Sequence, residues 1–536
     1  MKRYISLLPM LLIAAIGIAQ TANDTINRMV LVESTYNPII AGAVKRNFIP
    51  EEVKPLMNKE QVIYASESVN LTHFVREAKP APIAPMTTEK GWPGYLHLGY
   101  GNYNNLNGLA AFNWDINDTN NLALKAHADG WNGNFKLNNE KWNSHLYDMA
   151  LGADYNALLG KATLNIGLHT SYHNYNYLGG GTQSSNNIGA HIGIQGIAKE
   201  HYYYHATLSY SHFGRSTHFS ESVPHGENHI HSELSLGKDL YQWGMPKVLL
   251  SSDILTYGGE ITGYHNYYTL GITPQWDYRY KNLHLLGGLN MDLFIGKNIH
   301  HPVQVSPECS IEYTASRIFS TRLTLDGGRD INSFAQLYAL SPYWAAKEQI
   351  RPTHTFMNAY LEGNARILEG LHLHLGGGYK ILSDALFETA MDSVGTTYTG
   401  ITNHNAQVAT IDAAVNYTHK DLVSISAKGA YHHWMLRGDR ALLARAPQLK
   451  VDLDARVRII PNLHAYTNLR IISFSNTKAD TRERAIIDWS LGANYALNQR
   501  FSFFLDTHNL LNRRYSYYTG YPAQGFNVMA GAVVKF

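Results

Sequence analysis

Most of the chain is built of stretches of about ten or more residues in which apolar and polar side chains alternate. In the clearest stretch, between Val451 and Ile459, apolar side chains alternate with Asp452, Asp454, Arg456 and Arg458. Successive side chains of a strand point to opposite faces, so the stretch predicts a strand with one apolar and one charged face. If the strand slipped by one residue, each Arg near the bilayer centre would cost roughly 2–4 kcal/mol. We therefore expect these four charges in the lumen of a membrane barrel, bracing its wall.

The same alternation occurs in the last eleven residues. Phe526, Val528 and Phe536 fall on one face of the expected strand, while Asn527 and Lys535 fall on the other. A final strand with one lipid-facing side, ending in an aromatic residue, is typical of outer-membrane β-barrels. We predict that this strand closes the barrel.

The links between the alternating stretches are of two kinds. Very short links join residues 368–371, 459–464 and 495–500 and predict periplasmic turns. Longer, more polar links predict external loops: 177–187, 214–229, 329–351 and 436–446. Counting the stretches predicts an all-β transmembrane barrel of about 22 antiparallel strands. Several tyrosines at strand ends predict aromatic girdles at the membrane interfaces: Tyr172, Tyr175, Tyr177, Tyr202, Tyr203, Tyr204, Tyr517 and Tyr518.

Composition supports a barrel over a soluble enzyme. Only 16% of the 536 residues are charged, whereas 36 are tyrosine and 44 are glycine. The net charge of +2 gives no electrostatic footprint for nucleic acid. Beyond the N-terminus we find no apolar run long enough for a transmembrane helix. A β-propeller also repeats short strands, but no blade signature recurs.

The N-terminal part of the chain differs from the rest. Residues 1–19 carry Lys2 and Arg3, an apolar stretch and a small-residue cleavage site, which indicate a signal peptide. Residues 20–91 contain six prolines and no sustained alternation, so we expect a short periplasmic extension that serves as a partial plug or a docking arm. The barrel is expected over residues 92–536, in the outer membrane of a Gram-negative cell.

The end of the chain resembles a known family. The segment Asn509–Tyr515, the turn Gly520–Gly525 and the final strand together resemble the end of the barrel of TonB-dependent outer-membrane receptors. The resemblance covers about 35 residues in detail, from Phe501 to Phe536, and elsewhere rests on strand spacing. It implies 22 strands, a plugged lumen and transport or reception of a small solute.

One departure from the family pattern bears on function. Members of the family carry a plug domain of more than a hundred residues with glycine-rich segments, and residues 20–91 show none of these. This argues against TonB-energised uptake and for a relative without the usual plug. Two functions stay open: a receptor or transport barrel that passes a small solute through a gated lumen, or a non-transporting barrel that anchors or helps assemble a periplasmic or surface protein, such as a lipoprotein.

Side chains that could carry chemistry are few. The 27 histidines include His225, His229 and His231, which suggest a Zn²⁺ or Cu²⁺ site, although lumen-facing histidines beside a polar loop are the better interpretation. Asp506 and His508 share a face with Ser502 nearby, but nothing marks a nucleophile. We therefore predict no enzyme activity, no cofactor and, besides membrane lipid, only a protein partner.

Overall fold

The structure is a computed structural model. It describes residues 92–536 apart from 138–139, 198–200, 217–222, 259–263, 298, 300, 394–395, 439 and 476–483. The predicted signal peptide 1–19 and extension 20–91, together with the question of a plug there, lie outside the described residues.

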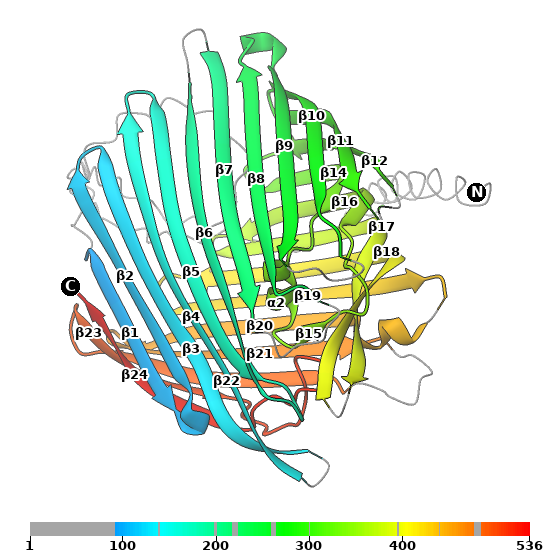
Figure 1. Cartoon of the computed structure of the whole chain (residues 1–536). Coiled ribbons are helices and arrows are strands. Elements are labelled where there is room, and N and C mark those ends of the chain that lie inside the picture. Colours follow the sequence, from blue (N-terminus) through cyan, green and yellow to red (C-terminus); the bar gives the residue numbers. More distant parts are fainter. Residues whose placement is uncertain are drawn as a thin grey trace, which may run out of the picture. The chain divides into compact units, whose positions relative to one another are not determined.

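The described residues form one antiparallel barrel wall, drawn in Figure 1. Its first strands are β1 (Gly94–Gly101), β2 (Leu106–Asn117), β3 (Asn120–Leu137), β4 (Glu140–Leu159), β5 (Ala162–Asn176), β6 (Thr182–Ile197), β7 (Tyr202–Arg215), β8 (Gly226–Lys238), β9 (Met245–Gly258), β10 (Tyr267–Tyr280), β11 (Leu283–Gly296), β12 (Val303–Pro307) and β13 (Cys309–Thr314). The remaining strands are β14 (Phe319–Asp330), β16 (Thr353–Leu368), β17 (Leu371–Ser393), β18 (Thr396–His419), β19 (Val423–Leu436), β20 (Pro447–Ile460), β21 (Leu463–Phe474), β22 (Ile486–Ala496), β23 (Phe501–His508) and β24 (Asn527–Lys535).

The wall contains 22 strands. The sheet has 24 assigned strands, but β12 and β13 both pair with β11 and are separated by Glu308 alone, so they form one strand of the wall. In addition, β15 (Trp344–Ala345) is a two-residue strand that pairs in parallel with β18 and does not belong to the wall. Counting β12 and β13 as one strand and leaving out β15 gives 24 − 2 = 22 wall strands, which confirms the predicted number.

The barrel is closed by its first and last strands. Register partners between β1 and β24 run from Tyr95 with Lys535 to Gly101 with Met529, so the wall that the described residues form has no unpaired edge strand. The blue β1 lies beside the red β24 in Figure 1. Phe526 and Phe536 flank β24, and their side chains are exposed on the outer side with Val528 between them on the same face.

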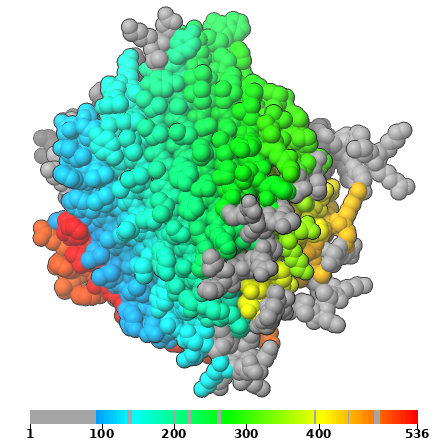
Figure 2. All heavy atoms as spheres, in the orientation of Figure 1, coloured from blue at the N-terminus to red at the C-terminus, as the bar shows by residue number. Residues whose placement is uncertain are grey.

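The alternation of the sequence matches the two faces of the wall. On β5 the even-numbered Leu168 and Tyr172 are 61% and 48% exposed on the outside. On β20 Leu453 and Val457 are likewise exposed. Figure 2 shows the strands coloured blue to green as a continuous outer surface. An apolar exterior around a closed barrel is the architecture of an outer-membrane protein.

The two ends of the barrel differ. Links of two residues, such as 160–161, 369–370 and 461–462, lie at the end where β24 finishes, which is therefore the periplasmic end. Long links, such as 331–352 and 509–526, lie at the external end. The helical segments of the described residues are η1 (Asn102–Asn104), η3 (Tyr241–Trp243), α2 (Phe334–Leu340) and η4 (Arg440–Arg445). None of them is long and apolar enough to cross a membrane.

The predicted aromatic girdles need a correction. Tyr172 and Tyr202 are exposed on the outer surface as expected. Tyr175 and Tyr177, in contrast, are each only 2% exposed and face the lumen. Tyr175 lies on the odd-numbered face of β5, which the alternation turns inward, and Tyr177 follows the end of that strand. Both contact a segment of the chain inside the barrel.

Candidate functional site

The link between β14 and β16 turns into the barrel instead of extending outward. We call residues 331–351 the inner segment. The link joins β14 and β16 at the external end, as the sequence predicts, but it folds inward and is not an exposed loop. The composition of the segment explains why it folds inward, because most of its large side chains are apolar and need a partner surface. The segment contains α2 and β15, and Trp344, Leu337 and Phe334 are at most 2% exposed.

Local sequence explains why α2 forms. Ser333 is the N-cap residue, and its Oγ accepts a hydrogen bond from the backbone N–H of Gln336. The Gln336 side chain accepts in turn from the backbone N–H of Ser333 at 2.7 Å, which completes a capping box. The spacing of Phe334, Leu337 and Tyr338 then places one apolar face against the wall.

An aromatic cluster buries the inner segment against the wall. Burial of each large apolar side chain contributes about 1.5–3 kcal/mol. The Tyr343 ring stacks on Tyr521 with centroids 3.5 Å apart, and the Arg215 guanidinium lies 4.4 Å from the centroid of Trp344. The buried members of the cluster are Tyr175, Tyr177, Phe213, Val223, Phe334, Leu337, Tyr338, Tyr343, Trp344, Ala345, Ala346, Ile350, Ile401 and Tyr521.

Polar contacts fix the position of α2. The backbone N–H of Phe334 donates to Oε1 of Glu227 on β8 at 2.8 Å, and Glu227 is only 2% exposed. The Tyr338 hydroxyl donates to Oδ1 of Asp148 on β4 at 2.7 Å. Burial and the neighbouring Asp148 carboxylate raise the pKa of Tyr338, so the phenol stays neutral.

The inner segment reaches the opposite wall. There β15 pairs with Thr399 and Gly400 of β18, and Ser341 Oγ donates to Thr399 Oγ1 at 3.0 Å. With β12 and β13 counted once and β15 left out, β18 is strand 16 of 22 and β5 is strand 5, so they are 16 − 5 = 11 strands apart, half of the circumference. The segment therefore bridges walls that face each other across the lumen.

Contacts between the external links reinforce this bridge. Leu178, just after β5, forms an isolated antiparallel bridge with Thr397 of β18. The Tyr521 hydroxyl joins the two, because it donates to Thr397 O at 2.6 Å and accepts from the backbone N–H of Leu178 at 3.1 Å. The external mouth is thus crossed by the inner segment and by side chains of the last external link.

The C-terminal end of the inner segment is held by a partly buried ion pair. Arg351 donates to Oδ1 of Asp384 from Nε at 2.9 Å and from Nη2 at 2.7 Å. Asn332 Nδ2 donates to the Arg351 backbone oxygen at 2.7 Å, which joins the two ends of the segment. Asp384 lies at a bulge of β17 and has a positive φ of 53°. The segment therefore leaves and re-enters the wall at one point.

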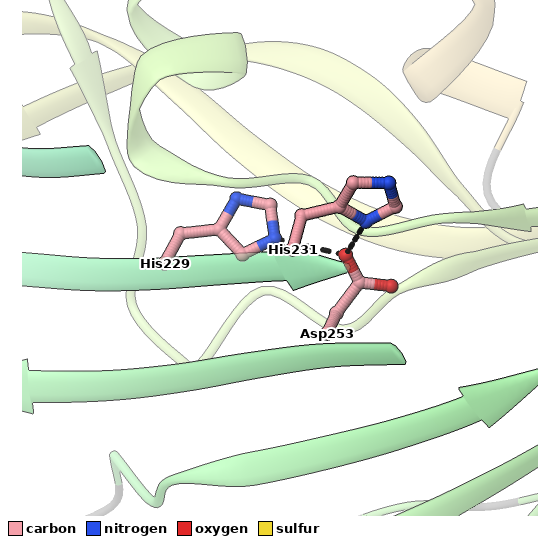
Figure 3. Close-up of side chains that lie close together, drawn as sticks. All are labelled: His229, His231 and Asp253. Atoms are coloured by element: carbon pink, nitrogen blue, oxygen red, sulfur yellow. Dashed lines mark hydrogen bonds and ion pairs between the residues drawn. The ribbon is translucent and has the colours of Figure 1, made fainter. Parts of the chain in front are cut away.

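The N-terminal end of the segment follows a buried charge cluster. Arg329 on β14 donates to Asp253 Oδ2 on β9 from Nη2 at 3.0 Å, and its Nη1 donates to Asp292 on β11. The side chains of all three residues are less than 10% exposed. On β8, His229 and His231 both point at the other oxygen of Asp253 (Figure 3). Sequence reasoning did not single out Asp253, Asp292 or Arg329.

The structure separates the three predicted histidines. His229 and His231 are together beside Asp253, at 2.9 Å and 2.7 Å from its Oδ1. His225 lies in the link before β8 and is exposed, outside this group. His229 and His231 converge because side chains two positions apart on a strand point to the same face.

The other predicted residues occupy the wall. The register of β20 against β21 places Asp452 opposite Arg470, whose Nε donates to it at 2.8 Å. Asp454 accepts from Asn468 at 2.7 Å, and Arg458 pairs with Asp421 at 3.5 Å. The first two contacts are cross-strand pairs of the lumen face, whereas Asp421 lies in the turn between β18 and β19.

Arg456 belongs to the same lumen face. It lines a hollow of about 430 Å³ near the periplasmic end together with His97, His464 and Tyr466. Lys420 and Asp421, from the turn between β18 and β19, also line it.

The Asp506 and His508 pair does not assemble a catalytic group. Asp506 accepts a hydrogen bond from Tyr466, whereas His508 Nδ1 lies 3.1 Å from Ser490 Oγ. The two side chains therefore have different partners, on β21 and β22, and among the described residues no hydrogen bond joins Ser502 to either of them.

Several solved structures share this fold. The FrpB iron transporter from Neisseria meningitidis aligns with a TM-score of 0.65 at 10% identity and covers 84% of this chain and 81% of its own. The copper transporter OprC aligns with a TM-score of 0.63 at 11% identity, over 83% and 80%. A variant of the ferric enterobactin receptor PfeA from Pseudomonas aeruginosa aligns with a TM-score of 0.61 at 10% identity, over 83% and 80%.

These likenesses define the class of the fold. No family model and no curated protein matches the sequence. At such low identity the structures show the fold alone, and that fold is the receptor-type outer-membrane barrel. The predicted resemblance to the barrel of TonB-dependent receptors is therefore confirmed for the fold. The proteins that share it here are named as receptors and transporters, not as enzymes.

Proposed function

We propose that this chain is an outer-membrane receptor or transporter that passes a small solute through its lumen, with the inner segment as the gate. The observation that carries the proposal is the bridge across the external mouth, where residues 331–351 join β4 and β8 on one side to β18 on the other.

The way in which the segment is attached supports a moving part. Its two ends meet at the Asn332–Arg351 contact, so it can swing out without changing the register of β14 or β16. Its hydrogen bonds to β18 are those of the two-residue β15, one hydroxyl pair and the two bonds between Arg351 and Asn403. The names of the structures that share the fold, which include iron and copper transporters, agree with a small-solute cargo.

Deletion and bilayer recording test this proposal. Residues 333–349 are replaced by a short Gly-Ser turn, which the closeness of Asn332 and Arg351 permits. We expect stable single-channel conductance from this variant and little from the full chain. A control replaces only the exposed Lys347 and Glu348 by Gly and Ser.

A second deletion separates the gate from the extension. Chains without residues 20–91 are recorded with and without the inner segment. If removal of 20–91 alone opens the pore, the extension is the plug and the inner segment is not the gate. If neither deletion raises conductance, but a co-purifying protein is lost with 20–91, the anchoring function is supported and transport is refuted.

A further inference from the structure

Two histidines and one carboxylate converge inside the barrel, beside Arg329, which lies two residues before the inner segment. His229 and His231 are two positions apart on β8, so both side chains point into the lumen. Asp253 is the register partner of His231 on β9. Figure 3 shows both imidazoles directed at one oxygen of Asp253. Nε2 of His229 lies 2.9 Å and Nδ1 of His231 lies 2.7 Å from that Oδ1 atom.

We propose that His229, His231 and Asp253 bind one divalent transition-metal ion of the Zn²⁺ or Cu²⁺ kind. The inference rests on the proposed function, since it assigns the class of cargo that the lumen receives. Imidazole nitrogen and carboxylate oxygen are the donors that these ions prefer. The three donor atoms lie within 4.8 Å of one another, and this is the only such group among the described residues.

The distances suit an ion after a small adjustment. Zn²⁺ binds nitrogen and carboxylate oxygen at about 2.0–2.2 Å, which places neighbouring donors of a tetrahedral site about 3.3–3.6 Å apart. The two separations found here are shorter by less than about 1 Å. Rotation of the two partly exposed imidazoles is enough to open the group, because their side chains are 22% and 34% exposed to the lumen.

The surroundings orient the carboxylate for this role. Asp253 Oδ2 accepts from Thr269 Oγ1 at 2.9 Å and from Arg329 Nη2 at 3.0 Å. These bonds fix the carboxylate and leave Oδ1 turned to the histidines. Such outer contacts of a ligand are a regular part of metal sites.

The charge balance favours a cation. Asp253 and Asp292 contribute −2 and Arg329 contributes +1, so the cluster carries −1 when both imidazoles are neutral. Asp253 is 3% exposed, and a buried excess negative charge is stabilised by a bound cation. Of the three donor residues, the two histidines are the ones exposed to the lumen, so an ion that arrives from the lumen meets them first.

Titration of the detergent-solubilised full chain tests the site. Zn²⁺ alone is titrated by calorimetry, and Mg²⁺ serves as the comparison ion. We expect one Zn²⁺ per chain, no Mg²⁺ binding at this site, and a loss of affinity of more than about tenfold in His231→Gln, which keeps a polar side chain toward Asp253. His229→Ala is expected to lose as much.

A matched control accounts for the other histidines of the chain. His284 lies 3.0 Å from Asp277 in the lumen, in the same kind of imidazole–carboxylate pair but without a second imidazole. His284→Ala must leave Zn²⁺ affinity unchanged. Equal losses in His284→Ala and His231→Gln, or unchanged affinity in His231→Gln, would overturn the proposal.

Spectroscopy with Cu²⁺ provides a readout that a structural role does not affect. Electron paramagnetic resonance of the Cu²⁺-loaded chain is expected to show coupling to two imidazole nitrogens, reduced to one in His229→Ala. Absence of nitrogen coupling in the unmodified chain contradicts the site. The gate is not required to open in either experiment, so a failure here leaves the conductance test of the proposed function untouched.

Discussion

Replacement of Trp344 by alanine is the sharpest single change to the inner segment. Trp344 is 1% exposed, its ring centroid lies 5.2 Å from that of Phe334, and the Arg215 guanidinium covers it at 4.4 Å. Truncation of a buried Trp to Ala costs about 3–5 kcal/mol. The wall strands keep their own hydrogen bonds, so we expect most of this cost to fall on the docking of the segment.

The expected effect on gating follows from that cost. Each 1.4 kcal/mol changes an equilibrium about tenfold, so the ratio of undocked to docked segment is expected to rise by roughly two to three and a half powers of ten. The assay is single-channel recording of Trp344→Ala in planar bilayers, with the fraction of time spent open as the readout. Heat-modified migration in gel electrophoresis verifies that the barrel is folded.

The control is another tryptophan. Trp243 in η3 is 68% exposed at the periplasmic end and does not contact the inner segment. Trp243→Ala is therefore expected to leave the open fraction unchanged. If a folded Trp344→Ala variant opens no more often than Trp243→Ala, the buried cluster does not hold a gate, and the reasoning is refuted.

Three further predictions concern the anchors and the wall. Glu227→Gln keeps an acceptor for the Phe334 N–H and is expected to leave the segment docked, whereas Glu227→Ala loses about 1–3 kcal/mol and raises conductance in the same recording. Burial raises the pKa of Tyr338 and Tyr343 above about 10, the pKa of an undocked tyrosine. Their contribution to docking is therefore complete below about pH 10 and is lost as the pH rises above it. Tyrosinate absorbance and conductance should increase together. Leu453→Arg on the outer face is expected to cost about 2–4 kcal/mol in denaturant unfolding from lipid vesicles, and an unchanged midpoint would contradict the assigned lipid face.

The wall was predictable because its signal is local. Alternation with a period of two fixes which side chains face lipid, and a slip of one residue reverses every one of them. The Asp452–Arg470 register pair follows from that rule. The same rule could have placed Tyr175 in the lumen, since Leu168 and Tyr172 on its strand have the opposite parity and face outward. The prediction of a girdle considered only that Tyr175 is an aromatic residue at a strand end, and not which face of the strand it lies on.

The inner segment was not predictable from spacing, because a long link between strands has the same length whether it extends outward or folds inward. A signal was nevertheless present. Phe334, Leu337 and Tyr338 follow a capping box at helical spacing, and an apolar helix in an external loop needs a surface to cover it. Asp253 and Arg329 are 76 residues apart in sequence, and only the closed wall brings them together.

A reversible cross-link between the inner segment and the opposite wall tests the central claim most directly. The oxygens of Ser341 and Thr399 are 3.0 Å apart, so Ser341→Cys with Thr399→Cys, in a Cys309→Ser background, places two thiols within reach of a disulfide. The variant also carries Trp344→Ala, which undocks the segment when no cross-link holds it, and its conductance is measured before and after reduction. The account predicts a closed barrel when oxidised and openings when reduced. Equal conductance in both states would show that the segment does not control the lumen.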